Sequence, residues 1–291
     1  MVKTISQLYL DARRDLMQQE DDQSAAMIAR NLVCHFTGLT NEQVIANREK
    51  YVGDETTAAM DKAVARILNQ EPLAYVLGEW EFYGLTLQVN SHVLIPRDDT
   101  VAVTDLAIRQ SLFLDSNPRI LDLCTGSGCI GLAIATRVKD SKVTLADLSQ
   151  EALMVAKHNI VTHKLTNRVS CVRANALEPA PAFLGKFDLI VSNPPYITSR
   201  EMLELPRSVA AFEPRMALHG GDDGLEFYRS IAKNYCHALK PGGYLCFEFG
   251  MGQGDDVCTI LEANGYTILE RARDYNDRER AVIARYDRKE D

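Results

Sequence analysis

The sequence predicts an α/β protein with a doubly wound, mostly parallel seven-stranded sheet, preceded by a small all-α domain and a β-hairpin linker. From residue 119 onward, apolar strands alternate with helices, which is typical of a parallel sheet covered on both faces. Before residue 76, apolar residues recur with the helical period alone, as in "TTAAMDKAVARILNQ". We therefore expect a helical domain over 1–75, a hairpin linker over 76–97 and an α/β domain over 98–291.

The expected strands can be read in order along the chain. In the linker, "EFYG", "LTLQV" and "VLIP" read as short strands separated by Gly84 and "NSH". In the α/β domain the strands are "RILDLC", "KVTLADLS", "VSCVRANA", "FDLIVSN" and "GGYLCFEFG". "YTILERARD" and "RAVIARYD" close the chain with no helix between them, which predicts an antiparallel hairpin at the edge of the sheet.

Composition narrows the class of function. The chain has 291 residues and a formal net charge of −8, with no run of lysine and arginine, which disfavours a duplex nucleic-acid binder. Its seven cysteines are scattered without a CxxC pair, which indicates reduced thiols, and its six histidines show no metal-ligand spacing. No segment approaches the about 18 apolar residues of a membrane span, and the N-terminus lacks a signal-peptide pattern. We expect a cytoplasmic protein without a metal site.

A glycine-rich loop predicts a cofactor site. "ILDLCTGSGCIG" passes from a strand into a helix, and Gly126, Gly128 and Gly131 fit the spacing G-x-G-x-x-G, which lets a ligand approach the backbone. Asp147 ends the next strand about 20 residues later, where a carboxylate can accept hydrogen bonds from ribose hydroxyls. The competing interpretations are a glycine turn without a ligand and an N-cap role for Asp147, which Ser149 could fill instead. The loop and the acid suit a nicotinamide cofactor or S-adenosylmethionine.

The stretch "LIVSNPPYIT" decides between the two cofactors. Asn193 ends the fourth strand of the α/β domain, which should neighbour the strand that carries the glycine loop. Pro194 and Pro195 hold the backbone extended, so the Asn193 side-chain oxygen and the Pro194 carbonyl can converge on a planar NH2 group, with Tyr196 stacked on its face. Such a grip would turn the nitrogen lone pair toward an electrophilic methyl group, as on a methyl sulfonium.

These motifs carry a resemblance to a known family. "NPPY" after the fourth strand, with "DLCTGSG" at the first, resembles the amino-methyltransferases that use S-adenosylmethionine and have the class I methyltransferase fold. "EPLAYVLGEWEFYGLTLQVNSHVLIPR", "FEPRMALHGGDDGLEFYR" and "DYNDRERAVIARY" look like the HemK/PrmC family, and the likeness covers essentially the whole chain. Those enzymes methylate the glutamine side-chain amide in the Gly-Gly-Gln motif of class 1 peptide chain release factors. The resemblance gives the helical domain a role in substrate recognition and implies no direct binding of nucleic acid or membrane.

The resemblance also assigns roles to residues. Cys124, Thr125, Gly126, Ser127 and Gly128 would hold the methionine part of the cofactor, Asp147 the ribose, and Asn175 and Ala176 the adenine, with Asn193 also beside the cofactor. The implied catalytic residues are Asn193, Pro194 and Tyr196, and the implied substrate contacts are Asn193, Pro194, Pro195, Tyr196 and Glu213. Glu213 could instead tie down the loop after "NPPY", and Glu248 ends a strand near the same crevice, where a structural role is the simpler interpretation.

Three positions depart from the family pattern. Asp98, Val101 and Asn175 stand where Pro, Glu and Asp are usual, and an Asn oxygen still accepts a hydrogen bond from an adenine amine. "CTGSGC" is also seen in sister enzymes that methylate a ribosomal-protein glutamine. The same motifs leave open methylation of adenine N6 in nucleic acid, and the fold by itself would permit a non-catalytic binding module.

Overall fold

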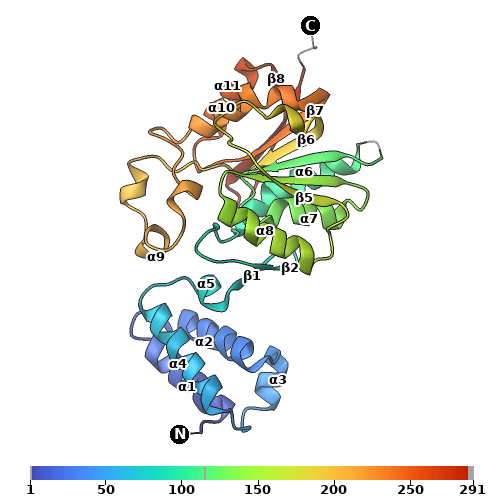
Figure 1. The fold of residues 1–291 in the computed structure, drawn as a ribbon. Helices are drawn as coiled ribbons and strands as arrows, with labels where there is room; N and C mark the ends of the chain where they lie inside the picture. Colours follow the sequence, from blue (N-terminus) through green and yellow to red (C-terminus); the bar gives the residue numbers. More distant parts are fainter. Residues whose placement is uncertain (1, 115, 288–291) are drawn as a thin grey trace. The chain divides into compact units, whose positions relative to one another are not determined.

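The computed structural model describes residues 2–114 and 116–287 (Figure 1). The chain divides into two compact units. One contains the chain up to Gly78 together with Arg207–Phe212, and the other contains Glu79–Pro206 and the chain from Glu213 onward. The short segment 207–212, with helix α9 (Arg207–Ala210), thus joins a helical unit that is more than 100 residues away in sequence.

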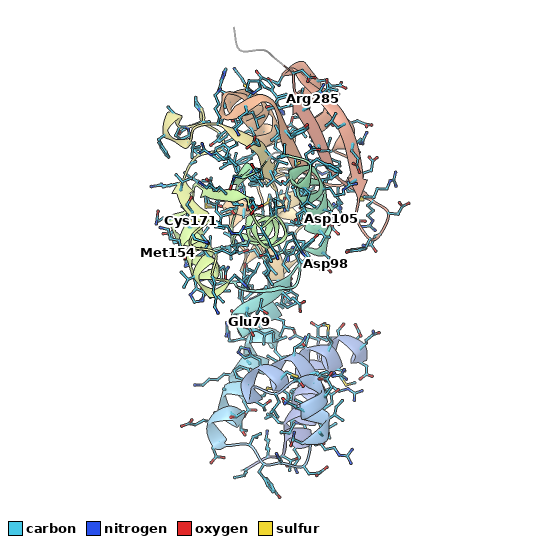
Figure 2. All side chains as sticks on the ribbon, turned by 90° about the vertical axis from the view of Figure 1, so that its right-hand side faces the viewer. Glu79, Asp98, Asp105, Met154, Cys171 and Arg285 are labelled. Carbon is cyan, nitrogen blue, oxygen red and sulfur yellow. The ribbon has the colours of Figure 1, made fainter. Side chains whose placement is uncertain are left out.

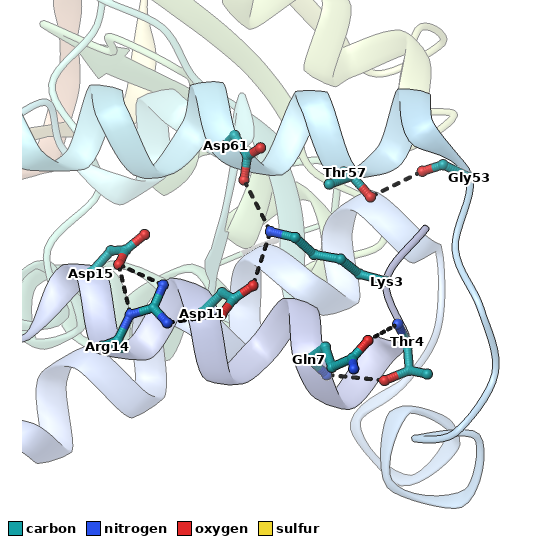
Figure 3. Close-up of polar contacts among 9 residues, drawn as sticks. All are labelled: Lys3, Thr4, Gln7, Asp11, Arg14, Asp15, Gly53, Thr57 and Asp61. Carbon is teal, nitrogen blue, oxygen red and sulfur yellow. Dashed lines mark hydrogen bonds and ion pairs between the residues drawn. The ribbon is translucent and has the colours of Figure 1, made fainter. Parts of the chain in front are cut away.

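The helical unit is built around three longer amphipathic helices and two short ones. They are α1 (Ile5–Leu16), α2 (Asp22–Thr37), α3 (Asn41–Ala46), α4 (Asp54–Leu68) and α5 (Leu73–Leu77). Buried Leu8, Leu32 and Met60 belong to its own apolar core. Thr4 and Gln7 form a capping box at the start of α1, and Lys3 Nζ bridges Asp11 of α1 at 2.9 Å and Asp61 of α4 at 3.8 Å (Figure 3).

The linker forms one hairpin, β1 (Glu79–Phe82) with β2 (Leu85–Gln88). Tyr83 and Gly84 make the two-residue turn, both with positive φ, and the Tyr83 hydroxyl donates to Asp105. Asp105, labelled in Figure 2, lies on α6 (Val101–Leu112). The expectation of a third strand at "VLIP" is wrong, because residues 93–96 pair with no other strand. The apolar run there is buried without pairing as a strand, with Val93 and Ile95 inside.

The large unit contains the expected seven-stranded sheet. Its strands are β3 (Arg119–Leu123), β4 (Lys142–Asp147), β5 (Val169–Arg173), β6 (Phe187–Ser192), β7 (Leu239–Glu248), β8 (Tyr266–Arg273) and β9 (Glu279–Tyr286). Their order is β5-β4-β3-β6-β7-β9-β8, so the sheet is wound outward from β3 in both directions. The pairs of β9 with β7 and β8 are antiparallel and the others are parallel, which confirms the doubly wound fold and its closing hairpin.

Helices cover both faces of this sheet. Successive strand residues alternate between two cores: Ile120 packs with α6, α7 (Cys129–Arg137) and α8 (Gln150–Thr162), while Leu121 packs with α10 (Glu226–Asn234) and α11 (Gly254–Ala263). Because both faces are covered, the central strands β3 and β6 read as largely apolar runs. The winding from β3 places β3 and β6 side by side, so both carboxyl ends open onto one crevice.

Candidate active site

A pocket of about 510 Å³ lies at the carboxyl ends of β3, β4 and β6. Nine of the predicted site residues line it: Cys124, Thr125, Gly126, Ser127, Asp147, Asn175, Ala176, Asn193 and Pro195. Four others are not part of its lining: Gly128, Pro194, Tyr196 and Glu213. The glycine-rich loop and the "NPPY" loop therefore meet at one cavity, as the sequence predicts. Four of the predicted residues lie outside the lining of that cavity.

The loop between β3 and α7 has an unusual backbone. Cys124 has φ of +62°, a left-handed conformation that is uncommon for a residue with a side chain, and Gly126 and Gly128 have φ of +55° and +86°. A Cβ on Gly126 would meet nothing within 4 Å, whereas one on Gly131 would lie 2.2 Å from Leu145 Cδ2. Gly131 therefore lets α7 pack closely on the sheet, and Gly126 leaves open space on the pocket side.

Asp147 turns its carboxylate toward this loop. Its Oδ2 accepts a hydrogen bond from Gly126 N and its Oδ1 one from Ser149 N, both at 2.9 Å. Ser149, rather than Asp147, caps α8 by accepting from Ala152 N. Burial raises the pKa of Asp147, while the backbone donors Gly126 and Ser149 lower it. The carboxylate keeps further lone pairs for a ligand hydroxyl.

A buried amide that sequence analysis missed fixes the other side of the loop. Asn159, on α8 and fully buried, donates from Nδ2 to Ser127 O at 2.9 Å and to Gln88 O at 3.1 Å. Its Oδ1 accepts from Gln88 N at 2.7 Å. The hairpin, α8 and the cofactor loop are thereby joined at one residue. A polar side chain inside the apolar face of "VAKHNIV" was the available signal.

The donor set of this pocket fits an adenosyl sulfonium ligand. Ser127 belongs to the pocket lining, and its buried Oγ has no hydrogen-bond partner among residues 2–114 and 116–287. Gly126 leaves room beside it, and Asp147 offers a carboxylate. Asn175 and Ala176 also line the pocket: Asn175 Oδ1 accepts from Leu177 N at 3.0 Å, and the Ala176 carbonyl accepts from Ser230 Oγ at 2.8 Å. An unused hydroxyl, an acidic group and an apolar end match an amino acid head, a ribose and a base in turn.

Asn193 follows β6 and lines the pocket. Its Nδ2 donates to Thr100 Oγ1 at 3.3 Å, while its Oδ1 accepts no hydrogen bond from the part of the chain that the structure describes. Pro194 and Pro195 after it are both buried. The site thus has a side-chain oxygen available as an acceptor.

Tyr196 lies beside the pocket and is held by close backbone packing. Its side chain packs against the core on the α10 and α11 face, and burial raises its pKa well above the usual range. A Cβ on Gly220 would lie 2.6 Å from Tyr196 Cα, and one on Gly224 would lie 2.3 Å from Tyr196 O. A Cβ on Gly250 would lie 3.0 Å from Tyr196 Cδ2. The glycines of "HGGDDGL" therefore permit the close approach that seats the "NPPY" loop.

Glu213 connects two segments near the pocket mouth. It is 6% exposed, its Oε2 accepts from Ile95 N at 3.2 Å, and its Oε1 pairs with Arg97. Both carboxylate oxygens are therefore engaged within the protein. This geometry matches the interpretation in which Glu213 ties down the loop after "NPPY".

The C-terminal motif reaches the same region through Arg280. Arg280 Nη2 pairs with Asp99 at 2.9 Å, and its Nε pairs with Asp274 at 3.0 Å. Asp274 also accepts from Asn276 N and Arg278 N, which shapes the "DYND" turn. The hairpin of β8 and β9 is thus anchored next to Thr100, the partner of Asn193.

Comparisons with known proteins agree with this architecture. The family model of the PrmC N-terminal domain matches residues 7–78, and that of the methyltransferase small domain matches residues 105–208. The release factor glutamine methyltransferase of Geobacter sulfurreducens is 36% identical over 278 residues, which cover 95% of each chain. The chain belongs to the release factor glutamine methyltransferase family. The resemblance indicated by the motifs is confirmed.

Other relatives of this family differ in length. The bifunctional methyltransferase of Rickettsia typhi is 37% identical over 271 residues, which cover 87% of this chain, and the chain spans about half of that protein (52%). The crystal structure of a methyltransferase from Pyrococcus furiosus shares the fold at a TM-score of 0.51 and 18% identity, covering 78% of this chain and 100% of that one. Across 2–114 and 116–287, no helix is long and apolar enough to cross a membrane.

Proposed function

We propose that this chain methylates the side-chain amide nitrogen of the glutamine in the Gly-Gly-Gln motif of class 1 peptide chain release factors, with S-adenosylmethionine as methyl donor. The observation that carries the proposal is the acceptor oxygen of Asn193 at the pocket, in a chain that is similar over 95% of its length to a release factor glutamine methyltransferase. The cytoplasm is the expected location of such a reaction and stays a prediction.

The proposed cofactor contacts follow from the pocket. Ser127 Oγ and the backbone of Thr125 to Gly128 would hold the amino acid head, Asp147 the ribose hydroxyls, and Ala176 with Asn175 the adenine. When bound, this cofactor supplies an electrophilic methyl group on a sulfonium. The apolar side chains of Ile130 and Phe227 in the pocket lining would help to exclude water from the bound cofactor.

Asn193 would act on the substrate rather than on the cofactor. Its Oδ1 and the Pro194 carbonyl would each accept one hydrogen of the substrate amide, which draws the nitrogen lone pair out of conjugation. The reaction forms an N–C bond, breaks the C–S bond and releases one amide proton. Tyr196 and Pro195 would complete the wall against the amide plane. We propose that Glu213 orders this wall through Arg97 and Ile95.

The helical unit is proposed to recognise the release factor. It carries large apolar side chains that are more than half exposed, including Leu10, Met27 and Ile45. Exposed apolar side chains form part of a protein-binding surface where they lie in one contiguous patch. Mutating them should raise KM for the release factor and leave cofactor binding unchanged.

The test uses an unmethylated release factor, S-adenosylmethionine and mass spectrometry, with Asn193→Ala beside the wild type. We expect a gain of one methyl on the Gly-Gly-Gln glutamine, lost in the variant. Isothermal titration should show cofactor binding in both proteins. Cofactor binding without that methyl gain would reject the release factor, and parallel reactions with ribosomal protein and with DNA or RNA would then identify the substrate.

A further inference from the structure

We propose that Glu248 is a positioning residue that sets the orientation of the Asn193 amide, acting through the hydroxyl of Thr100. This inference deepens the proposed function and rests on it, because it assigns a role to a residue that does not line the pocket. Three residues from three elements carry it: Thr100 before α6, Asn193 after β6 and Glu248 at the end of β7.

Strand register brings Glu248 beside Asn193. In the parallel pair of β6 and β7, Ser192 is the partner of Phe247, so the next residue of each strand is Asn193 and Glu248. Glu248 is 1% exposed, and its Oε2 has no hydrogen-bond partner among the described residues. A buried carboxyl group without a full set of hydrogen bonds lowers the stability of the folded protein, which suggests that Glu248 has a functional role.

The directions of the hydrogen bonds around Glu248 indicate what this role is. A carboxylate only accepts hydrogen bonds; burial raises the pKa of Glu248, and the hydrogen-bonding groups of Thr100 and Asn193 lower it, as nearby donors do. If the Thr100 hydroxyl donates to Glu248, its oxygen is left to accept from Asn193 Nδ2, which lies 3.3 Å away. The Asn193 NH2 group must then face inward, and its Oδ1 is the atom left for the substrate amide.

Protonation of Glu248 would remove this constraint. A neutral carboxyl can donate to Thr100, whose hydroxyl can then donate to Asn193 Oδ1, and the amide turns its NH2 group outward. That orientation repels a substrate NH2 group instead of accepting from it. Burial raises the pKa of Glu248 to about 7, so the change falls near neutral pH.

The other groups that face Glu248 leave this assignment intact. Asp99 raises its pKa and Arg280 lowers it, and these two form an ion pair with each other at 2.9 Å. The ring of Tyr196 and the thiol of Cys129 are kept neutral by burial, which raises the pKa of each. The Tyr228 hydroxyl donates to the Glu248 backbone oxygen and not to its carboxyl.

The kinetic test compares Glu248→Gln with the wild type. Glutamine has the same shape, yet its NH2 group can donate to Asn193 Oδ1, so both amide orientations become possible. We expect kcat to fall about tenfold or more with KM for S-adenosylmethionine unchanged. Thr100→Val should act likewise and Thr100→Ser should retain most of kcat, because serine keeps the hydroxyl. Wild-type kcat in Glu248→Gln, or equal kcat in Thr100→Val and Thr100→Ser, would overturn the proposal.

A second readout needs no turnover. In the 15N-labelled full chain, the Asn193 side-chain NH2 signals, assigned by their loss in Asn193→Asp, should move with a midpoint near pH 7. In Glu248→Gln the Asn193 signals should not change with pH. Glu270 lies on β8 and pairs with exposed Arg109, so in the control variant Glu270→Gln the Asn193 signals should match those of the wild type. Wild-type signals that stay fixed across that range also reject the role. If the wild type proves inactive on release factors, the proposed function fails and the NMR result still decides the positioning role.

Discussion

Gln253 donates a hydrogen bond from its side-chain nitrogen to the backbone carbonyl of Tyr196, 3.1 Å away, although 57 residues separate the two. The same nitrogen lies 3.4 Å from Gly224 O, and Gln253 Oε1 accepts from Gly250 N at 2.9 Å. The Gln253 side chain, just before α11, thus connects the end of the "NPPY" loop to the segments that contain Gly224 and Gly250.

Gln253→Ala should therefore loosen the "NPPY" loop. The substitution leaves the Tyr196 carbonyl and Gly250 N without their partner, at a cost of about 1–3 kcal/mol in the free energy of unfolding. We expect kcat to fall further than this loss of stability explains at temperatures where the protein stays folded. Thr259→Ala, on the exposed face of the same helix, is the matched control and should change neither quantity. Equal kcat in the two variants would contradict the role of Gln253.

Gly220→Ala should displace the backbone that follows Asn193. The added Cβ would lie 2.6 Å from both Pro195 O and Tyr196 Cα, and neither backbone atom can rotate away as a side chain could. Overpacking of this kind costs about 1–3 kcal/mol, and a shift of about 1 Å at the site can lower kcat about 100-fold. Methyl transfer assays and thermal unfolding measure the two effects.

Gly53→Ala serves as the control for this substitution. Its Cβ would meet nothing within 4 Å, and Gly53 has φ of −68°, which any residue adopts. We expect wild-type kcat in Gly53→Ala. If Gly220→Ala also kept wild-type kcat, the close contact with Tyr196 would not matter for activity.

Much of this site follows from local sequence patterns, and the rest depends on distant contacts. The alternation of strands and helices predicted that β3 lies beside β6, because a doubly wound chain that starts in the middle of the sheet places its first and fourth strands side by side. That neighbour relation alone brings the glycine loop and Asn193 to one pocket. The prediction of a strand at "VLIP" is wrong because an apolar, buried segment forms a strand only where a neighbouring strand is available to pair with it.

The supporting residues escaped prediction for a physical reason. Asn159 contacts Gln88 across 71 positions, and Arg280 contacts Asp99 from the opposite end of the domain. No local period encodes such pairs, since each partner is an ordinary polar residue in its own segment. The register of β6 with β7 was needed before Glu248 could be placed beside Asn193.

Asn159→Ala should weaken cofactor binding. It would leave Ser127 O and both backbone groups of Gln88 without their hydrogen-bond partner, which costs at least about 1–3 kcal/mol. Because the cofactor loop loses its anchor to α8, the Kd for S-adenosylmethionine should rise about tenfold or more, as measured by isothermal titration. The neighbouring His158 is exposed, so His158→Ala should keep the wild-type Kd. A Kd shared by both variants would show that the loop holds its shape without Asn159.

Glu248→Gln should stabilise the protein above neutral pH. The pKa of Glu248 is raised from 4.5 to about 7 by burial, so the folded state binds this proton more tightly than the unfolded state. The free energy of unfolding contributed by this group is therefore fully present below pH 4.5 and is lost as the pH rises to about 7. The loss amounts to at most about 3 kcal/mol, and glutamine avoids it.

Urea unfolding followed by circular dichroism at several pH values measures this effect. The variant should exceed the wild type in stability at about pH 8, and the difference should shrink toward about pH 5. Asp122, also buried with a pKa raised to about 7, contributes equally to both proteins and cancels in the difference. The free energy of unfolding of Glu270→Gln should follow that of the wild type at every pH, because the Glu270 carboxylate is exposed. A variant that gains stability while losing kcat would mark Glu248 as a group kept for positioning, whereas a constant difference across pH would show that its protonation is the same in both states.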